Sequence, residues 1–336
     1  MTNWFKRLTG IDEISPAQVR ESISIEGDRL VFPSGDSATF GRLQTPKLSD
    51  LRTAIEPPNS SRHQSTIREV VADVRDLHAD QSNANALFQV ASQFNLLEMV
   101  HPRVTPERGV GIYQDDPTQG PACAIACGAG TIYRNYFANV DGHIGQSTDR
   151  QIDCSADLGV ALGNTSDHLW QMQNGYLFPT PFGLDSVSAR IAGLNQPHRD
   201  ALCGELSIGL QWDTEVTAPR VGHRVTQAYC SALPVAYGRH RESQWTEFAK
   251  LILDAAYEAT FLAATINAQR TGVNRLFLTL LGGGVFGNKD EWIVAAIVRA
   301  FNLHRDRGID AILVSYGRPQ TAARRAIDAC SKRRGE

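Results

Sequence analysis

Three consecutive glycines follow an apolar run near the carboxyl end of the chain, where residues 280–292 read LLGGGVFGNKDEW. Glycine lets a ligand approach the backbone closely, and the free N–H groups at the start of a helix favour an anion. Asn288 and Glu291 have the spacing of a capping box, which predicts a helix that begins at Lys289. We therefore expect this loop to bind a phosphate group, with close packing of helix on sheet as the alternative reason for its glycines. The expected binding residues are Gly282, Gly283, Gly284, Val285, Phe286, Gly287 and Asn288.

The spacing of Gly282, Gly284 and Gly287 also fits the G-x-G-x-x-G pattern of dinucleotide-binding folds. Such folds place an acidic residue near the end of the next strand, whereas the strand expected at 310–317 has Asp310 at its start. The Walker phosphate-loop pattern fails as well, because no Gly-Lys-Ser or Gly-Lys-Thr run follows the glycines. Glycine spacing alone leaves a nucleotide-dependent oxidoreductase as one interpretation.

Carboxylates gather in the stretch VDGHIGQSTDRQID, which holds Asp141, Asp149 and Asp153 within thirteen residues. A carboxylate beside an anomeric carbon can stabilise an oxocarbenium-like transition state or activate water, and a second one can protonate the leaving group. Gln151 adds a neutral hydrogen-bonding group to the same stretch. Asp153 precedes an apolar helical pattern, so a helix N-cap is its alternative role. The alternative for the other two aspartates is that of loop acids exposed to water.

Polar side chains also stand out in two other segments. Asp115 and Asp116, in YQDDPTQGP, form a rival carboxylate pair, although Asp-Pro is also typical of turns. Asn95, in the apolar segment 86–98, could contact a ribose or position water, or simply end a strand. Glu98 closes that segment; a salt bridge is its expected role and a ribose contact the alternative. Nine histidines and six cysteines show no zinc-ligand spacing and no C-x-x-C pair, so no metal and no cofactor is expected.

The composition is that of an ordinary globular protein, with 336 residues of which 42% are hydrophobic and 21% charged. A net charge of −3 disfavours a nucleic-acid partner. The apolar runs are interrupted too often for a transmembrane helix, and the amino-terminal MTNWFKRLTG lacks the apolar centre of a secretory signal. We expect no membrane partner and a cytoplasmic location, with export by another route left open.

The elements that must position these residues divide the chain into two parts. Residues 1–80 are polar and mixed, and we expect them to form an N-terminal extension packed on the core, with residues 81–330 as the catalytic domain. Within the extension, apolar periodicity predicts strands at 23–32 and 38–45, helices at 47–55 and 65–80, and a loop at 57–61.

Strands and helices alternate in the larger part. Strands are expected at the start of 86–98 and at 169–178, 205–214, 223–237, 275–281 and 310–317, and helices at 122–137, 151–163, 244–268 and after 288. This order predicts a three-layer α/β/α sandwich with a mostly parallel or mixed sheet. Ligands of such sheets bind beyond the carboxyl ends of the strands. SQFN, residues 92–95, and GGGVFGN, residues 282–288, are therefore expected at one rim.

The motifs VASQFN and GGGVFG resemble two elements of the macrodomain superfamily, a strand end that carries an asparagine and a phosphate loop before a helix. Longer motifs, among them TQGPACA, YRNYF, RQIDC, NGY and SALPVAY, are similar to the divergent poly(ADP-ribose) glycohydrolase-like enzymes. They most resemble a bacterial-effector type that removes ADP-ribose from arginine. The resemblance spans residues 86–320. It implies a macrodomain-like fold and an ADP-ribosylhydrolase whose partners are ADP-ribose and ADP-ribosylated protein, with arginine among the acceptors.

The chain lacks the paired Gln-Glu-Glu of the glycohydrolases, and Asn95 is followed by Leu-Leu-Glu rather than by their glycine loop. Poly(ADP-ribose) itself is therefore disfavoured as the substrate. The effector-type enzymes use aspartates, which makes Asp153, Asp149 and Asp141 the expected catalytic residues, in that order. Asn95 and Gln151 are expected to contact the ligand. The alternative is a module that binds ADP-ribose without cleaving it, which would need the glycine loop but no reactive carboxylate.

Overall fold

The computed structural model describes residues 2–55 and 64–332, so the loop expected at 57–61 lies outside the described residues. At its centre is a seven-stranded sheet in the order β4-β11-β12-β6-β13-β14-β5. The strands are β4 (Arg42–Gln44), β5 (Thr66–Val71), β6 (Leu87–Ala91), β11 (Gly209–Thr217), β12 (Arg220–Cys230), β13 (Arg275–Leu278) and β14 (Asp310–Ser315). β11 is antiparallel to both of its neighbours, whereas β12, β6, β13, β14 and β5 are parallel. The sheet is therefore mixed, and the carboxyl ends of the parallel strands share one edge.

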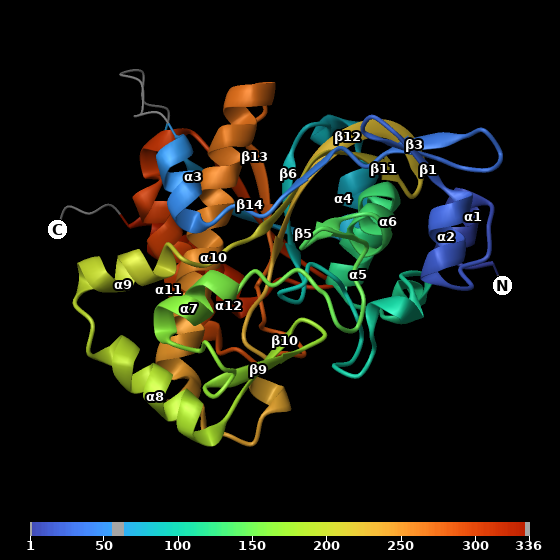
Figure 1. The fold of residues 1–336 in the computed structure, drawn as a ribbon. Coiled ribbons are helices and arrows are strands. Elements are labelled where there is room, and N and C mark those ends of the chain that lie inside the picture. Colours follow the sequence, from blue (N-terminus) through green and yellow to red (C-terminus); the bar gives the residue numbers. More distant parts are fainter. Residues whose placement is uncertain (1, 56–63, 333–336) are drawn as a thin grey trace.

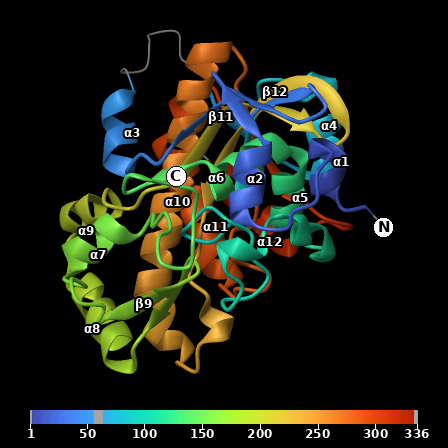
Figure 2. The ribbon, with the colours of Figure 1, turned by 45° about the vertical axis from the view of Figure 1, so that its right-hand side comes forward.

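Helices cover both faces of the sheet (Figure 1). One face carries α10 (Glu242–Thr271), α11 (Asp290–Leu303) and α12 (Thr321–Ser331), and the other carries α4 (Val74–Ala79), α5 (Gln119–Ala126) and α6 (Gly128–Tyr136). On the outer side of α10 lie α3 (Leu48–Ala54), α8 (Pro181–Ala192) and α9 (Gln196–Cys203). Figure 2 shows α8 and α9, with α7 (Ala156–Leu162), along one side of α10. The three-layer α/β/α sandwich with a mixed sheet, predicted from the sequence, is confirmed.

The first 80 residues are partly built into this sandwich. α1 (Trp4–Thr9), α2 (Pro16–Ser22) and a small sheet of β1 (Ser24–Glu26), β2 (Arg29–Val31) and β3 (Ser37–Thr39) lie near α6 in Figure 1. There Trp4, Phe5 and Leu30 share a second buried cluster with Ile132 and Tyr136 of α6. β4 and β5, by contrast, are the two edge strands of the main sheet. A boundary at residue 80 therefore does not coincide with a break in that sheet.

The helix predicted over 65–80 is wrong in its first half, where the chain forms β5 before it enters α4. Ile67, Val70 and Val71 are β-branched and favour an extended backbone. β5 pairs in parallel with β14 along its whole length, and this pairing outweighs the helical spacing of the apolar residues. The helix begins only after Asp73, whose carboxylate accepts a hydrogen bond from the N–H of Arg75 at 2.9 Å.

The helix predicted over 122–137 is interrupted at Cys127, which has φ −112° and ψ 60° and separates α5 from α6. Gly128 lies so close to its neighbours that an added Cβ would be 2.7 Å from the ring of Trp4. Its N–H donates to the Thr217 hydroxyl at 2.9 Å. The break therefore lets the start of α6 contact both the N-terminal segment and β11.

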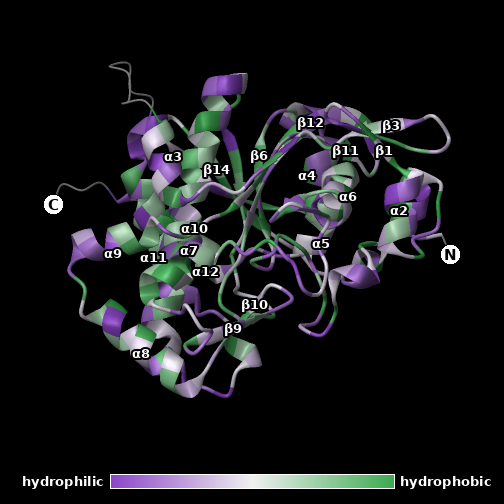
Figure 3. Ribbon diagram, in the orientation of Figure 1, coloured by the Kyte–Doolittle hydropathy of each residue, from purple (hydrophilic) through white to green (hydrophobic). Residues whose placement is uncertain are grey.

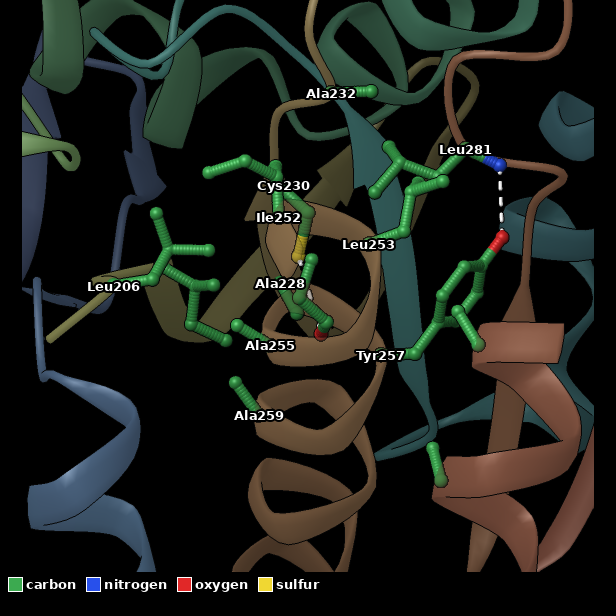
Figure 4. Packing of buried hydrophobic residues seen from close by; sticks show 14 of the residues in the cluster. Leu206, Ala228, Cys230, Ala232, Ile252, Leu253, Ala255, Tyr257, Ala259 and Leu281 are labelled. Carbon is green, nitrogen blue, oxygen red and sulfur yellow. Dashed lines mark hydrogen bonds between the residues drawn. The ribbon is translucent and has the colours of Figure 1, made fainter. Parts of the chain in front are cut away.

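Small residues let α10 lie directly against the sheet. Ala228 and Cys230 of β12 pack with Ile252 and Ala255 of α10 (Figure 4). β6, β13 and β14 carry mostly hydrophobic residues, which are coloured green in Figure 3, in agreement with their burial. The same helix carries the buried Tyr257, whose hydroxyl reaches the segment that follows β13 (Figure 4). The core helix thus connects directly to the glycine loop.

Candidate functional site

A pocket of about 460 Å³ opens beyond the carboxyl ends of β6, β12 and β13. Its walls come from residues 91–93, 98–100, 115–121, 279–282 and 284–286, to which Tyr176, Ala232 and Tyr237 add side chains. The rim predicted from the sequence is confirmed in part. Ser92 and Gln93, at the end of β6, line the pocket together with the glycine loop.

The glycine loop presents backbone donors to this pocket. Within the described residues, the N–H groups of Gly282, Gly284, Val285 and Phe286 have no hydrogen-bond partner, although all four residues line the pocket. The N–H of Gly283 is used inside the loop, since it donates to the carbonyl of Leu280 at 3.0 Å. Unpaired N–H groups before a helix N-terminus form a favourable site for an anion.

Steric contacts explain why two positions of the loop, Gly282 and Gly287, are glycine, but they do not explain Gly284. Gly282 has φ +74°, and an added Cβ would lie 2.5 Å from the Cβ of Ala232. Gly287 has φ +70°, and its Cβ would lie 2.9 Å from Ala236. Gly284, in contrast, has no heavy atom within 4 Å of an added Cβ. The first two glycines are therefore required by the fold, whereas the backbone at Gly284 faces open space in the pocket wall.

Asn288 closes the loop in a way that differs from the expected helix cap. Its amide nitrogen donates to the carbonyl of Leu233 at 2.8 Å, and its N–H donates to the carbonyl of Gly282 at 2.9 Å. The side chain thus ties the loop to the end of β12. α11 begins at Asp290, one residue later than predicted, with Lys289 as its N-cap. Asn288 is absent from the pocket lining, so the geometry gives it a structural part in the loop.

Glu98 is the most deeply buried carboxyl group of the pocket wall, with 6% of its surface exposed. Its Oε1 has no hydrogen-bond partner among the described residues, and the expected salt bridge does not form there. Burial raises the pKa of Glu98 well above its ordinary value; the nearby Arg134 acts in the opposite direction and Asp116 adds to the rise. The pocket therefore contains a carboxyl group that tends to hold its proton.

Arg134 lies next to this acid in the interior, with 1% of its surface exposed. Its guanidinium donates to the carbonyl of Leu96 at 3.2 Å and to the amide oxygen of Gln211 at 3.2 Å. It also lies 3.7 Å from the ring centre of Tyr229. The guanidinium thus places a fixed positive charge behind the segment that carries Glu98.

Asp115 and Asp116 line the pocket just before α5. Asp116 accepts a hydrogen bond from the N–H of Thr118 at 2.8 Å, so the turn role considered for this pair is present as well. The preceding segment, a 3₁₀-helix at η3 (Gly111–Asp115), is held by Glu13 of the N-terminal region. The Glu13 carboxylate accepts from the N–H groups of Val110 at 2.8 Å and Gly111 at 2.7 Å.

The three aspartates expected to be catalytic do not line this pocket. Asp153 is half-buried and accepts from both the N–H and the hydroxyl of Ser155, at 2.8 and 2.7 Å. Burial raises its pKa, against the effect of these hydrogen bonds. Asp149 and Asp141 are exposed, and Asp141 has φ +50° in a turn. The structure therefore does not bring the three carboxylates together at the pocket, and their catalytic role stays a prediction.

Asn95 and Gln151 do come together, but behind the pocket wall. Asn95 is completely buried, and its amide nitrogen donates to Gln151 Oε1 at 2.8 Å. Gln151 in turn donates to Asn174 Oδ1 at 2.9 Å. Asn95 Oδ1 accepts from the N–H of Leu97 at 3.1 Å, which shapes the bend that leads to Glu98. Neither residue lines the pocket, so any ligand contact by either stays a prediction.

An aromatic cluster forms another part of the pocket wall. The rings of Tyr176, Tyr237 and Phe286 lie 5.5 to 5.7 Å apart, centre to centre. The Tyr176 hydroxyl donates to the carbonyl of Met99 at 2.7 Å. The two tyrosines were not singled out from the sequence, although they lie in the motifs NGY and LPVAY. Only the meeting of three separate segments in the fold makes them neighbours.

Among the described residues, no group of three or more His, Cys, Asp or Glu side chains is arranged to hold a metal ion. No helix within residues 2–55 and 64–332 is long and apolar enough to cross a membrane.

Comparison with known proteins gives no match to a protein-family model and no match to a curated protein. Among solved structures, the chain is similar to a poly(ADP-ribose) glycohydrolase from Thermomonospora curvata, at 14% identity and a TM-score of 0.45 over 94% of this chain and 96% of the other. The same enzyme with the inhibitor ADP-HPD gives 15% identity and a TM-score of 0.44 over the same shares. The Deinococcus radiodurans enzyme in complex with ADP-ribose gives 12% identity and a TM-score of 0.44 over 86% of this chain and 93% of the other.

Proposed function

We propose that this protein is an ADP-ribosylhydrolase that removes ADP-ribose from modified protein side chains, with arginine as the acceptor. The observation that carries the proposal is one pocket that combines four unpartnered backbone N–H groups of the glycine loop, counted among the described residues, with the buried carboxyl of Glu98. The first feature suits a diphosphate, and the second suits proton transfer.

The ligand would lie with its diphosphate over the loop from Gly282 to Phe286. The N–H groups of Gly284, Val285 and Phe286 would donate to phosphate oxygens, and the start of α11 adds the positive end of a helix dipole. Tyr176 and Tyr237 offer aromatic surface to the sugar or base. Of the loop residues predicted from the sequence, Gly282, Gly284, Val285 and Phe286 are thus the proposed ligand contacts.

The chemistry assigned to the pocket is hydrolysis at the anomeric C1″ carbon. A water molecule attacks C1″ while the bond from C1″ to the acceptor nitrogen breaks. Glu98, in its protonated form, donates its proton to the leaving nitrogen, and Asp116 accepts the proton of the attacking water. The products are free ADP-ribose and the unmodified side chain.

Arginine is favoured as the acceptor by the two carboxylates at the pocket mouth. Asp115 and Asp116 line the pocket near Glu98, and the rise in the pKa of Glu98 includes a contribution from Asp116. A planar guanidinium suits carboxylates through paired hydrogen bonds, which an ester-linked acceptor cannot form.

The position of three aspartates bears on a second catalytic assignment and on a second candidate function. Asp153, Asp149 and Asp141 remain candidate catalytic residues from the sequence, although they lie outside the pocket lining. Their position also suits a second candidate function, a module that binds ADP-ribose without cleaving it.

The decisive experiment incubates the purified protein with ADP-ribosyl-arginine, ADP-ribosyl-glutamate and ADP-ribosyl-serine substrates and follows the release of free ADP-ribose. We expect release from the arginine substrate above the other two. Calorimetry with ADP-ribose runs in parallel. Binding without release from any substrate would replace the hydrolase with the binding module, and no binding at all would remove both.

A further inference from the structure

A second pocket adjoins the first at Asp115 and Asp116, which line both. Its volume is about 400 Å³, and it shares Val100, Asp115 and Asp116 with the main pocket. Arg103 and Arg108 line the rest of it, together with the apolar side chains of Val104 and Ile112. We call this second pocket the acceptor groove. It is not needed to hold a nucleotide, because the glycine loop contributes no residue to it.

The order of the two pockets defines a path. A ligand with its diphosphate on the glycine loop and its reacting carbon near Glu98 must send the attached group past Asp115 and Asp116. The acceptor groove begins at these two residues. In this pose, whatever is attached to the ADP-ribose would leave the main pocket through the groove.

The groove is held rigidly by contacts outside it. Glu107 accepts from the N–H of Thr148 at 2.7 Å, and Asn174 donates to the carbonyl of Pro102 at 2.6 Å. Glu13 accepts from the N–H of Val110, which lies in the chain between Arg108 and Ile112 of the groove. A groove whose walls are fixed in advance loses little entropy on binding, which suits specific recognition.

Asp115 and Asp116 lie where the groove adjoins the main pocket, whereas Arg103 and Arg108 line the rest of the groove. Arg103 and Arg108 are exposed, and neither lies within ion-pair distance of a carboxylate in the described residues, although Arg108 acts electrostatically on the carboxylate of Glu13. Val100, Val104 and Ile112 give the same groove an apolar surface. Two unpaired cations beside apolar contacts match a peptide segment that carries acidic side chains. A nucleotide chain fits less well, because it carries a phosphate on every unit and Asp115 and Asp116 would repel the phosphate nearest to them. A peptide can place its acidic residue beyond these two carboxylates, opposite the arginines.

We infer that the acceptor groove binds the polypeptide on either side of the modified residue and selects segments with an acidic residue close to it. This inference rests on the proposed function, since it places the acceptor relative to the ADP-ribose site. Exposed charge pairs each contribute modestly to binding, so two of them predict a preference of roughly 3- to 10-fold for acidic over basic flanks. Complementary charge acts mainly on the choice of partner, which is the property inferred here.

The test compares two peptides that carry one ADP-ribosyl-arginine each, one flanked by Asp and Glu and the other by Lys. Binding is measured by fluorescence anisotropy and hydrolysis by ADP-ribose release, with free ADP-ribose and ADP-ribosyl-arginine as ligands without flanks. The variant is Arg103→Glu/Arg108→Glu. The control, Arg190→Glu/Arg324→Glu, changes the net charge equally at exposed arginines outside both pockets.

The wild-type protein and the control should prefer the acidic peptide, and the groove variant should lose or reverse this preference. All three should bind free ADP-ribose with affinities within about 2-fold of one another. Equal binding of both peptides to the wild-type protein would overturn the inference while ADP-ribose binding leaves the proposed function standing. A groove variant that weakens binding of an ADP-ribose oligomer but not of the peptides would assign the groove to a nucleotide chain and also overturn it. Failure of the wild-type protein to bind ADP-ribose would remove the proposed function and the inference together.

Discussion

The hydroxyl of Tyr257 accepts a hydrogen bond from the N–H of Leu281 at 2.9 Å (Figure 4). The same hydroxyl donates to the carbonyl of Thr279 at 2.7 Å. A side chain from the middle of α10 therefore fixes both ends of the short segment between β13 and the glycine loop. This buried hydroxyl therefore helps to position the free N–H groups, together with the contacts of Asn288 at the other end of the loop.

Replacing Tyr257 by Phe should lower both stability and ligand affinity. The change keeps the ring but leaves buried backbone groups without their partner, which costs about 1–3 kcal/mol of unfolding free energy. ADP-ribose affinity should fall because the loop loses its anchor. Denaturant melts and calorimetry measure the two effects, and Tyr133→Phe, whose hydroxyl lies outside both pockets, is the control. A Tyr257→Phe protein with wild-type affinity would show that the loop is held without it.

Two glycines of the loop should respond differently to a side chain. Gly284→Val meets open space, so the protein should fold normally and lose ADP-ribose binding, because the methyl groups occupy the diphosphate position. Gly282→Ala meets Ala232 and a positive φ, so it should lose stability. Thermal melts and calorimetry on both variants test this pair. Unchanged affinity in a folded Gly284→Val protein would remove the loop from the site.

Glu98→Gln should change how stability depends on pH. Because burial raises the pKa of Glu98, the folded state binds more protons than the unfolded state above pH 4.5, and the free energy of unfolding falls as the pH rises through the raised pKa. The substituted amide does not titrate, so the variant should gain stability relative to the wild type over that range. Turnover should drop by roughly 100-fold or more, because the amide cannot donate the proton.

Glu107→Gln is the matched control, because the pKa of Glu107 is shifted downwards, in the opposite direction to the pKa of Glu98. Burial acts to raise the pKa of Glu107, but hydrogen bonds from Thr148 and Thr105 outweigh it and lower the pKa. Its stabilising contribution is therefore present above pH 4.5 and lost as the pH falls through the lowered pKa. In urea melts between about pH 4 and 8, the free energy of unfolding of the two variants, relative to the wild type, should change in opposite directions with pH. Parallel curves for Glu98→Gln and the wild type would contradict the assignment of a raised pKa to Glu98.

Asp153→Asn and Asp116→Asn decide between the two catalytic assignments. Asp153 binds Ser155, and an asparagine can keep much of that turn, so a loss of about 1 kcal/mol or less is expected with turnover nearly intact. Asp116→Asn should reduce turnover by roughly 100-fold while ADP-ribose still binds. Steady-state rates and a melting curve on both, with Asp149→Asn and Asp141→Asn alongside, provide the comparison. A loss of turnover of that size in Asp153→Asn alone would restore the assignment made from the sequence.

Glu13→Ala tests whether the N-terminal region shapes the pocket. The substitution leaves the N–H groups of Val110 and Gly111 and the hydroxyl of Tyr136 without their acceptor, at a cost of about 1–3 kcal/mol. The KM should rise, because the segment with Asp115 loosens. Glu13→Gln keeps one acceptor oxygen and should lie between the wild type and Glu13→Ala. If Glu13→Ala kept the stability and KM of the wild type, the N-terminal region would not contribute to the shape of the pocket.

The layers of the fold follow from apolar periodicity, which is why the sheet, α10 and the glycine loop could be predicted. The failures have physical causes. β5 has the apolar spacing of a helix, but its β-branched residues and its pairing with β14 make it a strand. Asn95 and Gln151 have the residue types of ligand contacts, but they satisfy each other behind the wall. Glu98 was expected in a salt bridge. It is buried without one because α5 covers it, and no local sequence pattern predicts that contact.

The pairing of β5 with β14 also bears on how the protein is made. Thr66 lies opposite Asp310, a separation of 244 residues, so a strand synthesised early waits for one synthesised near the end. At roughly 5–20 residues per second, a ribosome needs on the order of 10–50 s to add the missing partner. Until then β5 has an unpaired edge, and such distant pairings slow folding. The order of translation therefore makes this side of the sheet the last to close and the one most exposed to misassembly in the nascent chain.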